Sequence, residues 1–524
     1  MKKNVITMKR LLVATGVSAA LLGLQGCDAD DPDMGTPKEL AEFQGKLIDG
    51  YLAGATIYLD LNNNSRLNAG EPNAITDQDG YFSQSKDGVD YCREGAPDFE
   101  ARHCLRTVVA DSSATIRTFG GFDITTGEPF TGSLARNVTV GSSGVVNNAV
   151  VTPLTTAVAA SENPAEVLDA LGITEEDLDT DFLSEEEFSS ELTGKALAMH
   201  KVATVFSELI DEVFDEFGEE LTLPSNSYNF VYQGLVANQP ADGEWSTADL
   251  LAAFDAAEQA AADAYAASEI SNIPSVNSTD RFNAVEDAVI LLGVIEATLD
   301  EETTFEELEQ NLLGVELVTS KIVYEGASDE EVAEIVSQVE DPNSDLNTLL
   351  ADETADFQGL LETVITEDTN FSEIVVVDPQ DLTNPMNKQL SINYSDEETT
   401  GAFHIFFSGT DGSASGTLVT CLNYESTDPD LNQSEYDIED VNSTGSWFNI
   451  DSNSMVLSLT LGGGNYDVVL SSKGLDAEQL NKYSFSYGGD NVSWTSINGI
   501  ISNDDVNALP VPATDADCAA VTAG

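Results

Sequence analysis

The fold of the first part of this chain is decided by the stretch Gly54-Ala55-Thr56-Ile57-Tyr58-Leu59-Asp60, a polar loop to Glu71, and Thr76-Asp77-Gln78-Asp79-Gly80-Tyr81-Phe82. β-Branched and aromatic residues precede the loop, and a Gly-containing turn follows it, which is typical of strands joined by turns. A similar pattern of strand-like segments and turns extends from Phe43 to about Val151. We therefore expect a β domain over residues 44–155.

The loop itself has the spacing of a calcium-binding loop of the EF-hand type. It reads Asp60-Leu61-Asn62-Asn63-Asn64-Ser65-Arg66-Leu67-Asn68-Ala69-Gly70-Glu71. A large, hard cation needs six or more oxygens from a tightly wound loop and one acid at the end that binds through both oxygens. The predicted ligands are Asp60, Asn62, Asn64, the carbonyl of Arg66, Asn68 and Glu71.

Two features of the loop weaken this prediction. Ser65 stands where Gly normally permits the sharp turn, and two of the ligands are neutral Asn, so the affinity should be low. The alternative is a hydrated turn rich in Asn that binds nothing.

The strands and loop together, over about residues 44–85, resemble the B-repeat domains of bacterial surface adhesins and the carboxypeptidase regulatory-like domains. The resemblance implies a β-sandwich, a hairpin closed by the turn at Thr76–Phe82, and calcium in the loop. It also implies that Asp77 and Asp79 lie near the same ion.

The beginning of the chain has the pattern of an export signal. Lys2, Lys3, Lys9 and Arg10 precede an apolar stretch that is too short to span a bilayer. The stretch closes with Leu24-Gln25-Gly26-Cys27, which resembles the lipobox of bacterial lipoproteins. That resemblance implies a signal peptide over 1–26, and cleavage before Cys27 with attachment of diacylglyceryl and a further acyl chain such as palmitate.

An acidic tether over 27–43 would follow the lipid. The outer membrane or cell surface is favoured over the inner membrane, although Asp28 directly after the cysteine is an inner-membrane retention signal in enteric bacteria. The alternative is a soluble secreted chain, or one anchored in another way, with a coincidental cysteine.

The charge of the chain is strongly negative. It has 93 acidic and 20 basic residues and a formal net charge of −73, and four of the basic residues lie in the signal. Such a charge repels nucleic acid, which is therefore excluded as a partner. Hydrophobic residues make up 41% of the chain, and they recur with the periods of helices and strands. We therefore expect a folded protein with an acidic surface rather than a disordered chain.

Four cysteines remain beyond Cys27, and an exported chain meets oxidising conditions. Three pairings are compatible with the sequence. The local one, Cys92 with Cys104 and Cys421 with Cys518, is favoured because it needs no contact between distant domains. Their spacing is unlike that of a zinc site.

The spacing of apolar residues differs between the middle and last parts of the chain. A helical domain is expected over 156–377, where Val285, Ala288, Val289, Leu292, Ile295 and Leu299 would share one helix face. Capping boxes are predicted at Thr303 with Glu306 and at Ser328 with Glu331. Residues 384–518 alternate like antiparallel strands of a sandwich or small barrel. The fold class is thus multidomain α+β.

A second resemblance concerns Gly121–Phe130 and Val151–Thr156. These segments look like parts of large, uncharacterised bacterial surface lipoproteins in which such a β domain is followed by a helical region. The resemblance implies an architecture and says little about function.

No catalytic motif stands out, and the three histidines, His103, His200 and His404, fall in different regions. Whether the protein is an enzyme stays open, with a non-enzyme favoured. The last domain offers aromatic residues that would suit a glycan or protein partner, namely Trp447, Tyr466, Tyr487 and Trp494. We expect a role in binding, adhesion or scaffolding at the cell envelope. The alternatives are a polysaccharide hydrolase that contacts its substrate through the C-terminal β domain and a structural spacer without a ligand.

Overall fold

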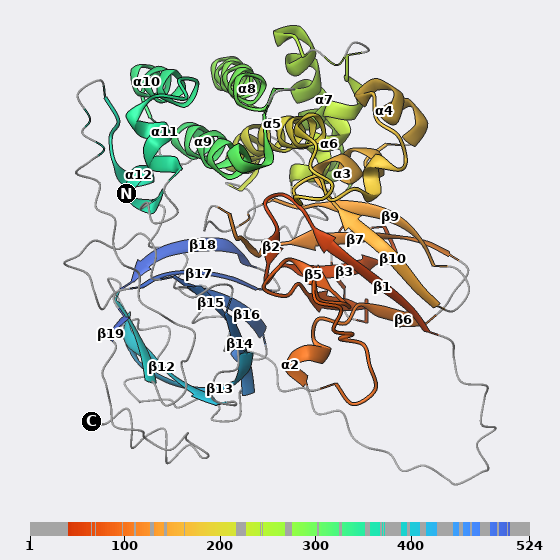
Figure 1. Ribbon diagram of the computed structural model, residues 1–524, viewed down its shortest axis with the longest axis vertical. Helices are drawn as coiled ribbons and strands as arrows, with labels where there is room; N and C mark the ends of the chain where they lie inside the picture. Colours follow the sequence, from red (N-terminus) through yellow and green to blue (C-terminus); the bar gives the residue numbers. More distant parts are fainter. Residues whose placement is uncertain are drawn as a thin grey trace.

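The computed structural model describes residues 40–371 with internal gaps, of which the longest is 216–226, and the strands of a C-terminal sheet between residues 389 and 502. It confirms a mixture of helices and sheets arranged as β, then α, then β along the chain (Figure 1). Cys27 and Cys518 lie outside the described residues. In the part that is described, no helix has the length and apolarity required to cross a bilayer.

The first part of the chain forms two four-stranded sheets and a short strand pair. The strands and one short helix are β1 (Leu40–Leu47), β2 (Leu52–Ala53), β3 (Thr56–Asp60), β4 (Asn73–Ile75), β5 (Tyr81–Phe82), α2 (Asp98–Ala101), β6 (Arg106–Val108), β7 (Ser112–Phe119), β8 (Phe122–Asp123), β9 (Ala135–Val140) and β10 (Gly144–Val151). One sheet has the order β10-β1-β5 with β6 also on β1, the other has the order β4-β3-β7-β9, and β2 pairs with β8.

Strand β1 begins inside the segment that was expected to be tether. Leu40–Leu47 pairs in parallel with β10, and Phe43 is fully buried. The expected boundary at residue 43 is therefore four residues too late. Burial of one Phe side chain contributes about 1.5–3 kcal/mol, which explains why these residues join the sheet.

One core lies between the two N-terminal sheets. Its fully buried side chains alternate along the strands, as the period of two requires, and include Phe43, Leu47, Ile57, Leu59, Phe82 and Ile116. Gly45 lies where the β1–β10 register shifts, and a Cβ there would come within 2.2 Å of the carbonyl oxygen of Ala149. Only glycine permits this close approach of two backbones.

The helices follow directly after β10 and stack over one end of these sheets (Figure 1). They are α3 (Pro153–Ala159), α4 (Pro164–Leu171), the 3₁₀ turn η2 (Asp177–Asp179), α5 (Ser190–Asp215), α6 (Ser227–Ala237), α7 (Thr247–Ala267), α8 (Ser278–Thr298), α9 (Phe305–Val323), α10 (Asp329–Val339), α11 (Asp345–Leu350) and α12 (Phe357–Glu362). Their core also includes Ile48 and Val150 from the β part, so the two parts share buried surface.

Two sequence expectations about the helices need correction. Val289 was expected on the buried face of α8, but 40% of it is exposed, and Leu291 and Val294 are buried in its place. The cap of α9 lies one residue later than predicted, because Glu307 accepts hydrogen bonds from the backbone N–H and hydroxyl of Thr304. Half of the capping box at Ser328 is confirmed, since its hydroxyl accepts from the backbone N–H of Glu331, whereas the Glu331 carboxylate accepts from the backbone N–H of Ile365.

The C-terminal strands form one nine-stranded sheet in which consecutive strands from β11 to β18 pair antiparallel. They are β11 (Gln389–Ser395), β12 (Thr399–Ser408), β13 (Ser415–Ser426), β14 (Thr444–Asn449), β15 (Ser454–Leu461), β16 (Gly464–Ser471), β17 (Tyr483–Gly489), β18 (Val492–Gly499) and β19 (Ile501–Ser502). The last strand returns to pair with the first, β11.

Trp447 in β14 is fully buried and packs edge-on against Phe407. The sequence predicts Trp447 as a residue of a possible ligand face. Because its side chain is buried, Trp447 packs in the interior and is not part of an exposed face. The side chains of Tyr466, Tyr487 and Trp494 lie outside the described residues, as does that of Cys421.

Candidate functional site

The predicted calcium loop connects two paired strands. Asp60 ends β3, and β4 starts two residues after Glu71. The strands run antiparallel, and the backbone N–H of Leu59 donates to the carbonyl of Pro72 at 2.9 Å. The loop therefore connects two strands of a sheet, as the sequence predicted, and is not flanked by helices.

The beginning of the loop winds as tightly as a cation loop must. Asp60 is fully buried, and its Oδ2 accepts a hydrogen bond from the backbone N–H of Ser65 at 2.8 Å. Asn63 and Ser65 both have left-handed backbone conformations, with φ of 57° and 59°. Ser65 thus takes the conformation that usually calls for Gly, at a cost of order 1–3 kcal/mol.

Glu71 closes the loop with both carboxylate oxygens. Oε1 accepts from the backbone N–H of Leu61 at 3.1 Å, and Oε2 accepts from that of Asn68 at 2.8 Å. The amide of Asn62 donates to Oδ1 of Asn68 at 2.7 Å. Three of the predicted ligand residues, Asn62, Asn68 and Glu71, are therefore joined by hydrogen bonds, while Asp60 binds the backbone of Ser65. Asn64 and Arg66 lie outside the described residues.

A cationic side chain that sequence reasoning missed lies at this loop. Nε of Arg117 donates to Oδ2 of Asp60 at 2.9 Å, and only 13% of the arginine side chain is exposed. Arg117 is on β7, opposite Tyr58 of β3, so it reaches Asp60 diagonally across the pair. The alternation of residues 112–119 places Arg117 on the outer face, but only the pairing of β3 with β7 brings it to Asp60.

Asp77 belongs to a different turn from the loop. Its carboxylate accepts hydrogen bonds from the backbone N–H groups of Asp79 and Tyr81 and from the hydroxyl of Tyr91, the last at 2.7 Å. Burial raises the pKa of Asp77 to about 6, although these hydrogen bonds oppose the rise. The turn leads from β4 of one sheet to β5 of the other, so it does not close a hairpin as the resemblance implied. The described contacts of Asp77 include no residue of the 60–71 loop.

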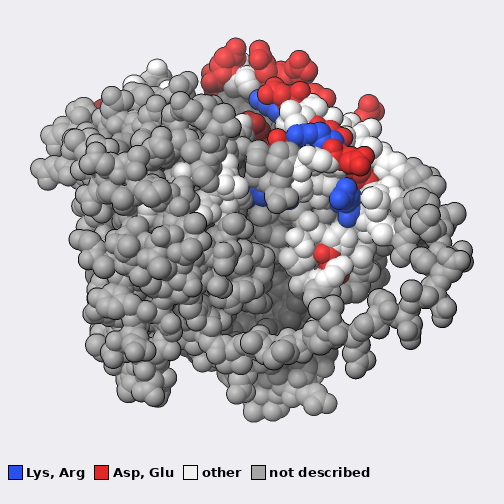
Figure 2. Space-filling model, turned by 90° about the horizontal axis from the view of Figure 1, so that it is seen from below, with Lys and Arg blue, Asp and Glu red and all other residues white. Residues whose placement is uncertain are grey.

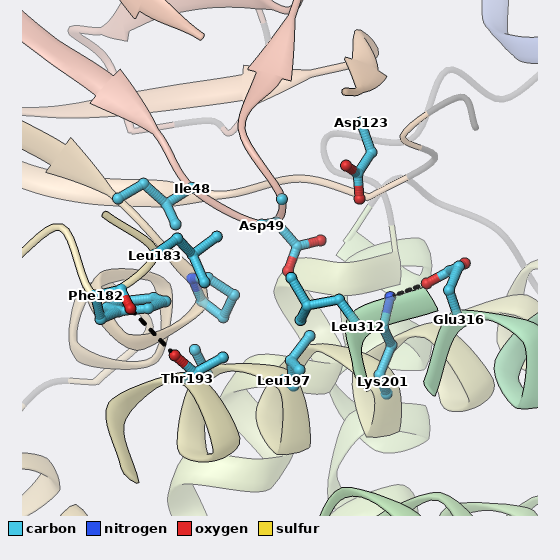
Figure 3. A pocket seen from close by; sticks show the side chains of 13 residues that line it. Ile48, Asp49, Asp123, Phe182, Leu183, Thr193, Leu197, Lys201, Leu312 and Glu316 are labelled. Carbon is cyan, nitrogen blue, oxygen red and sulfur yellow. Dashed lines mark hydrogen bonds and ion pairs between the residues drawn. The ribbon is translucent and has the colours of Figure 1, made fainter. Parts of the chain in front are cut away.

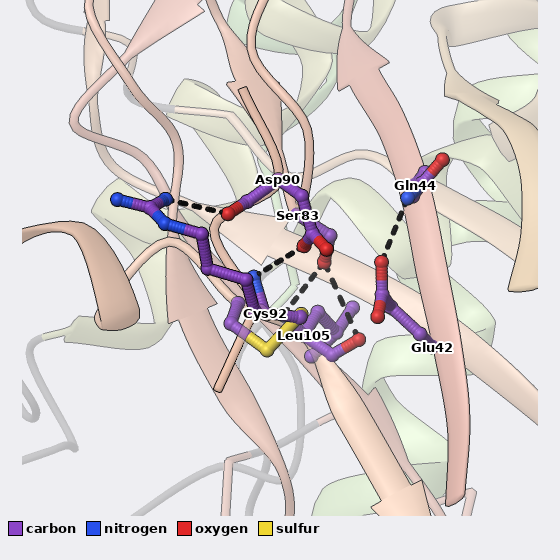
Figure 4. The surroundings of a disulfide bond; sticks show 8 residues. Glu42, Gln44, Ser83, Asp90, Cys92 and Leu105 are labelled. Carbon is purple, nitrogen blue, oxygen red and sulfur yellow. Dashed lines mark hydrogen bonds between the residues drawn. A yellow bond between two sulfur atoms is a disulfide. The ribbon is translucent and has the colours of Figure 1, made fainter. Parts of the chain in front are cut away.

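Cys92 and Cys104 are joined by a disulfide, as predicted, with their Cα atoms 5.0 Å apart (Figure 4). Sγ of Cys92 lies near carboxylate oxygens of Glu42 and Asp90. Because its sulfur is oxidised, Cys92 offers no thiolate to a metal there. The predicted pair of Cys421 and Cys518 lies outside the described residues.

A groove of about 510 Å³ runs beside this disulfide and is lined by residues of the 91–106 segment. Tyr91 contributes an aromatic ring, and Arg93 and Arg106 contribute guanidinium groups beside Glu94. Its volume lies in the range of ligand-binding sites.

On the face shown in Figure 2, the described acidic side chains gather along one edge with Lys and Arg among them.

A second group of charged residues is buried where the sheets meet the helices (Figure 3). Asp49 follows β1, His200 and Lys201 lie on α5, and Glu316 lies on α9. His200 Nε2 is 3.1 Å from Asp49 Oδ2, and Lys201 Nζ is 2.5 Å from Glu316 Oε2. Asp49, Lys201 and Glu316, with Asp123 of β8 and apolar residues, line a cavity of about 20 Å³, which has room for about one water molecule.

Burial sets the protonation of these groups. It raises the pKa of Asp49 to about 7, even though Lys201 opposes the rise, and it raises the pKa of Asp123 well above its usual value. Burial lowers the pKa of His200. Burial opposes the charge of Lys201 as well, but the carboxylates of Glu316 and Asp49 prevail and raise its pKa. His200 is therefore favoured as the neutral imidazole beside a Lys201–Glu316 ion pair, and Asp49 is protonated below about pH 7.

The surroundings of His200 fit a neutral imidazole. The ring stacks with those of Phe130 and Tyr228, with centroid distances of 5.4 and 5.6 Å. A Cβ on Gly132 would lie 2.8 Å from its Cε1. The partner of His200 could not be predicted from the sequence, since Asp49 is far away in the chain and no motif links the two residues.

Further polar contacts join the same two parts of the chain. Asp181 accepts a hydrogen bond from the hydroxyl of Tyr51 at 2.8 Å and pairs with Lys46. Arg136 of β9 donates to the carbonyl of Leu178 at 3.0 Å and pairs with Asp179. The buried charges thus form a joint between sheet and helices. A cavity for one water molecule is too small for a substrate.

Neither a protein family, nor a curated protein, nor a solved structure gives a significant match to this chain.

Proposed function

We propose that this protein is an exported lipoprotein that acts in binding, adhesion or scaffolding at the outer membrane or cell surface. Lipidation at Cys27 would anchor it, with the signal and tether before the first sheet. The two N-terminal sheets would correspond to the β-sandwich of the adhesin-type domains, and the C-terminal strands to a small barrel or sandwich. Cys421 and Cys518 would add a second disulfide.

The observation that carries the binding role is the groove beside the Cys92–Cys104 disulfide. Tyr91 and Arg106 present an aromatic ring and a planar donor, which suit a glycan or protein partner with carboxylate groups, whereas Arg93 is already paired with Glu100. The test is binding of the full chain to envelope polysaccharides and surface proteins, compared with Arg106→Ala and with Lys86→Ala. Loss with Arg106→Ala alone supports the groove; equal binding by all three chains contradicts it.

Calcium is the cation that we propose for the 60–71 loop. The predicted donor set is all oxygen, and the loop turns tightly at Ser65. These observations support a site that holds calcium through Asp60, Asn62, Asn64, the Arg66 carbonyl, Asn68 and Glu71. The ion would brace the end of the β3–β4 hairpin.

The anchor has a direct test. Cys27→Ala should release the protein from membranes, because no acyl chain would then hold so acidic a chain to a bilayer. The measurement is fractionation of cells that express wild type and variant, with high-salt washing of the membranes. A variant that still sediments with washed membranes would contradict the lipid anchor.

A further inference from the structure

Arg117 occupies the position of a cation at the predicted calcium loop. Its Nε donates to Oδ2 of Asp60 at 2.9 Å, and Asp60 is fully buried. The same Oδ2 also accepts from the backbone N–H of Ser65. Arginine remains charged at any pH at which a protein is folded, so Asp60 always has a counterion while this contact lasts.

The contact is held by the sheet. Arg117 lies in register with Tyr58 on the neighbouring strand, two residues before Asp60, and both partners are largely shielded from water. A charge-assisted hydrogen bond with so little exposure is stronger than one at a surface. At the other end of the loop, Glu71 is satisfied by two backbone N–H groups. The described part of the loop is therefore closed by groups of the chain itself.

A calcium ion entering this loop would meet the guanidinium group. Two cations on one buried carboxylate repel each other, and the screening of bulk water is weak at a site with so little exposure. The long arginine side chain can swing into solvent while its stem stays on the outer face of the sheet. Departure of the guanidinium group would leave Asp60 to the metal.

We propose that Arg117 is an internal cation that competes with calcium for Asp60 and thereby lowers the calcium affinity of the loop. This inference rests on the calcium site proposed above and adds its regulation. Removal of the positive charge should raise the affinity, and metal binding should free the arginine.

The test compares wild type, Arg117→Met, Arg117→Lys and Asp60→Asn in the full chain. Met keeps the apolar stem without the charge, and Lys keeps the charge. Calcium binding is measured by titration calorimetry, in enough sodium chloride to screen the acidic surface. We expect Arg117→Met to bind calcium roughly tenfold or more tighter, equal to about 1.4 kcal/mol, and Arg117→Lys to bind within a few-fold of wild type. Asp60→Asn should not bind.

A second measurement needs no substitution at the loop. With ¹⁵N-labelled arginine, the Nε–H of Arg117 should give a protected resonance in chelator and lose that protection when calcium is added. Arg117→Lys identifies the resonance.

The outcomes separate the two proposals. Equal calcium affinity in wild type and Arg117→Met, or a protected Nε–H that persists at saturating calcium, would overturn the competition and leave the calcium site intact. Absence of calcium binding in both wild type and Arg117→Met would overturn the site and, with it, the competition.

Discussion

Ser65 and Glu71 show how single residues shape the candidate cation loop. Ser65 accepts a left-handed backbone, and its N–H is held by buried Asp60. Glu71, of which 9% is exposed, holds the N–H groups of Leu61 and Asn68. Glu71 thus has a structural role in the absence of any metal. The sequence suggested only the role of a ligand.

Glu71→Ala should therefore lower stability even in chelator, by about 1–3 kcal/mol, because two backbone donors lose their acceptor. Glu71→Gln keeps one acceptor oxygen and should lose less. With calcium at a hundredfold excess over the dissociation constant, wild type should gain about 2.7 kcal/mol. The affinity expected for this ligand set is roughly 10⁻⁴–10⁻³ M.

Thermal melting of the full chain with calcium or chelator, in high sodium chloride, measures both effects. Equal calcium-induced shifts in wild type and Glu71→Ala would mean that calcium acts only as a diffuse counterion.

Asp49 makes stability depend on pH. Its pKa is raised from 3.8 to about 7 by burial, so the folded state holds a proton that the unfolded chain releases above pH 3.8. This contribution to stability is complete below pH 3.8 and is lost as the pH rises through about 7. The loss amounts to up to roughly 4 kcal/mol if Asp49 titrates alone.

Asp49→Asn should remove this loss, since an amide stays neutral and can donate to His200. The measurement is the free energy of unfolding between pH 4 and 8 for wild type and variant. Burial lowers the pKa of His103 to about 3, which adds an opposite trend between pH 3 and 6.5 to both proteins. A wild-type decline above pH 4 that persists unchanged in Asp49→Asn would contradict this assignment.

At the scale of elements, two glycines in helices show how packing overrides helix propensity. A Cβ at Gly234 of α6 would come within 2.3 Å of the carbonyl oxygen of Ala253 on α7. A Cβ at Gly293 of α8 would have no atom within 4 Å. Propensity alone favours Ala over Gly by about 1 kcal/mol at both positions.

We therefore expect Gly234→Ala to destabilise the protein by about 1–3 kcal/mol through overpacking of α6 against α7. Gly293→Ala, the matched control, should be neutral or stabilising by up to about 1 kcal/mol. Denaturant unfolding of both variants checks the pair. The close packing of α6 on α7 would be disproved by two variants that are equally stable.

The disulfide acts on the segment that carries the groove. It links residues 12 positions apart, which limits the freedom of that segment in the unfolded chain. Replacement of both Cys92 and Cys104 by Ser should lower the free energy of unfolding by about 3 kcal/mol. The denaturation midpoint should fall to the same value when wild type is reduced. A variant as stable as the oxidised wild type would refute this contribution.

At the scale of the whole molecule, the sheets and the first helices meet through buried charges as well as through apolar contacts. Asp181 binds both Lys46 and Tyr51, while Lys201 and Glu316 pair beneath Asp49. Apolar residues of both parts, such as Ile48, enter the helical core. The β part is thus held on the helices by both apolar and charged contacts.

The order of the β, α and β parts, the strands on either side of the cation loop, the local disulfide and the cap at Ser328 could all be predicted from the sequence. Each depends on residues close together in the chain, where period, turn chemistry and spacing act directly. The buried face of α8 was only partly predictable, because burial of Leu291 in place of Val289 depends on which neighbours the helix meets.

The pairings between residues far apart in the chain were decided only by the tertiary structure. Arg117 meets Asp60 because β7 lies beside β3, and His200 meets Asp49 because α5 packs under the end of β1. Trp447 faces the interior because of how its strand is packed. No local pattern encodes such contacts, since they arise when burial of apolar surface brings distant segments together and leaves their charged groups to find partners there.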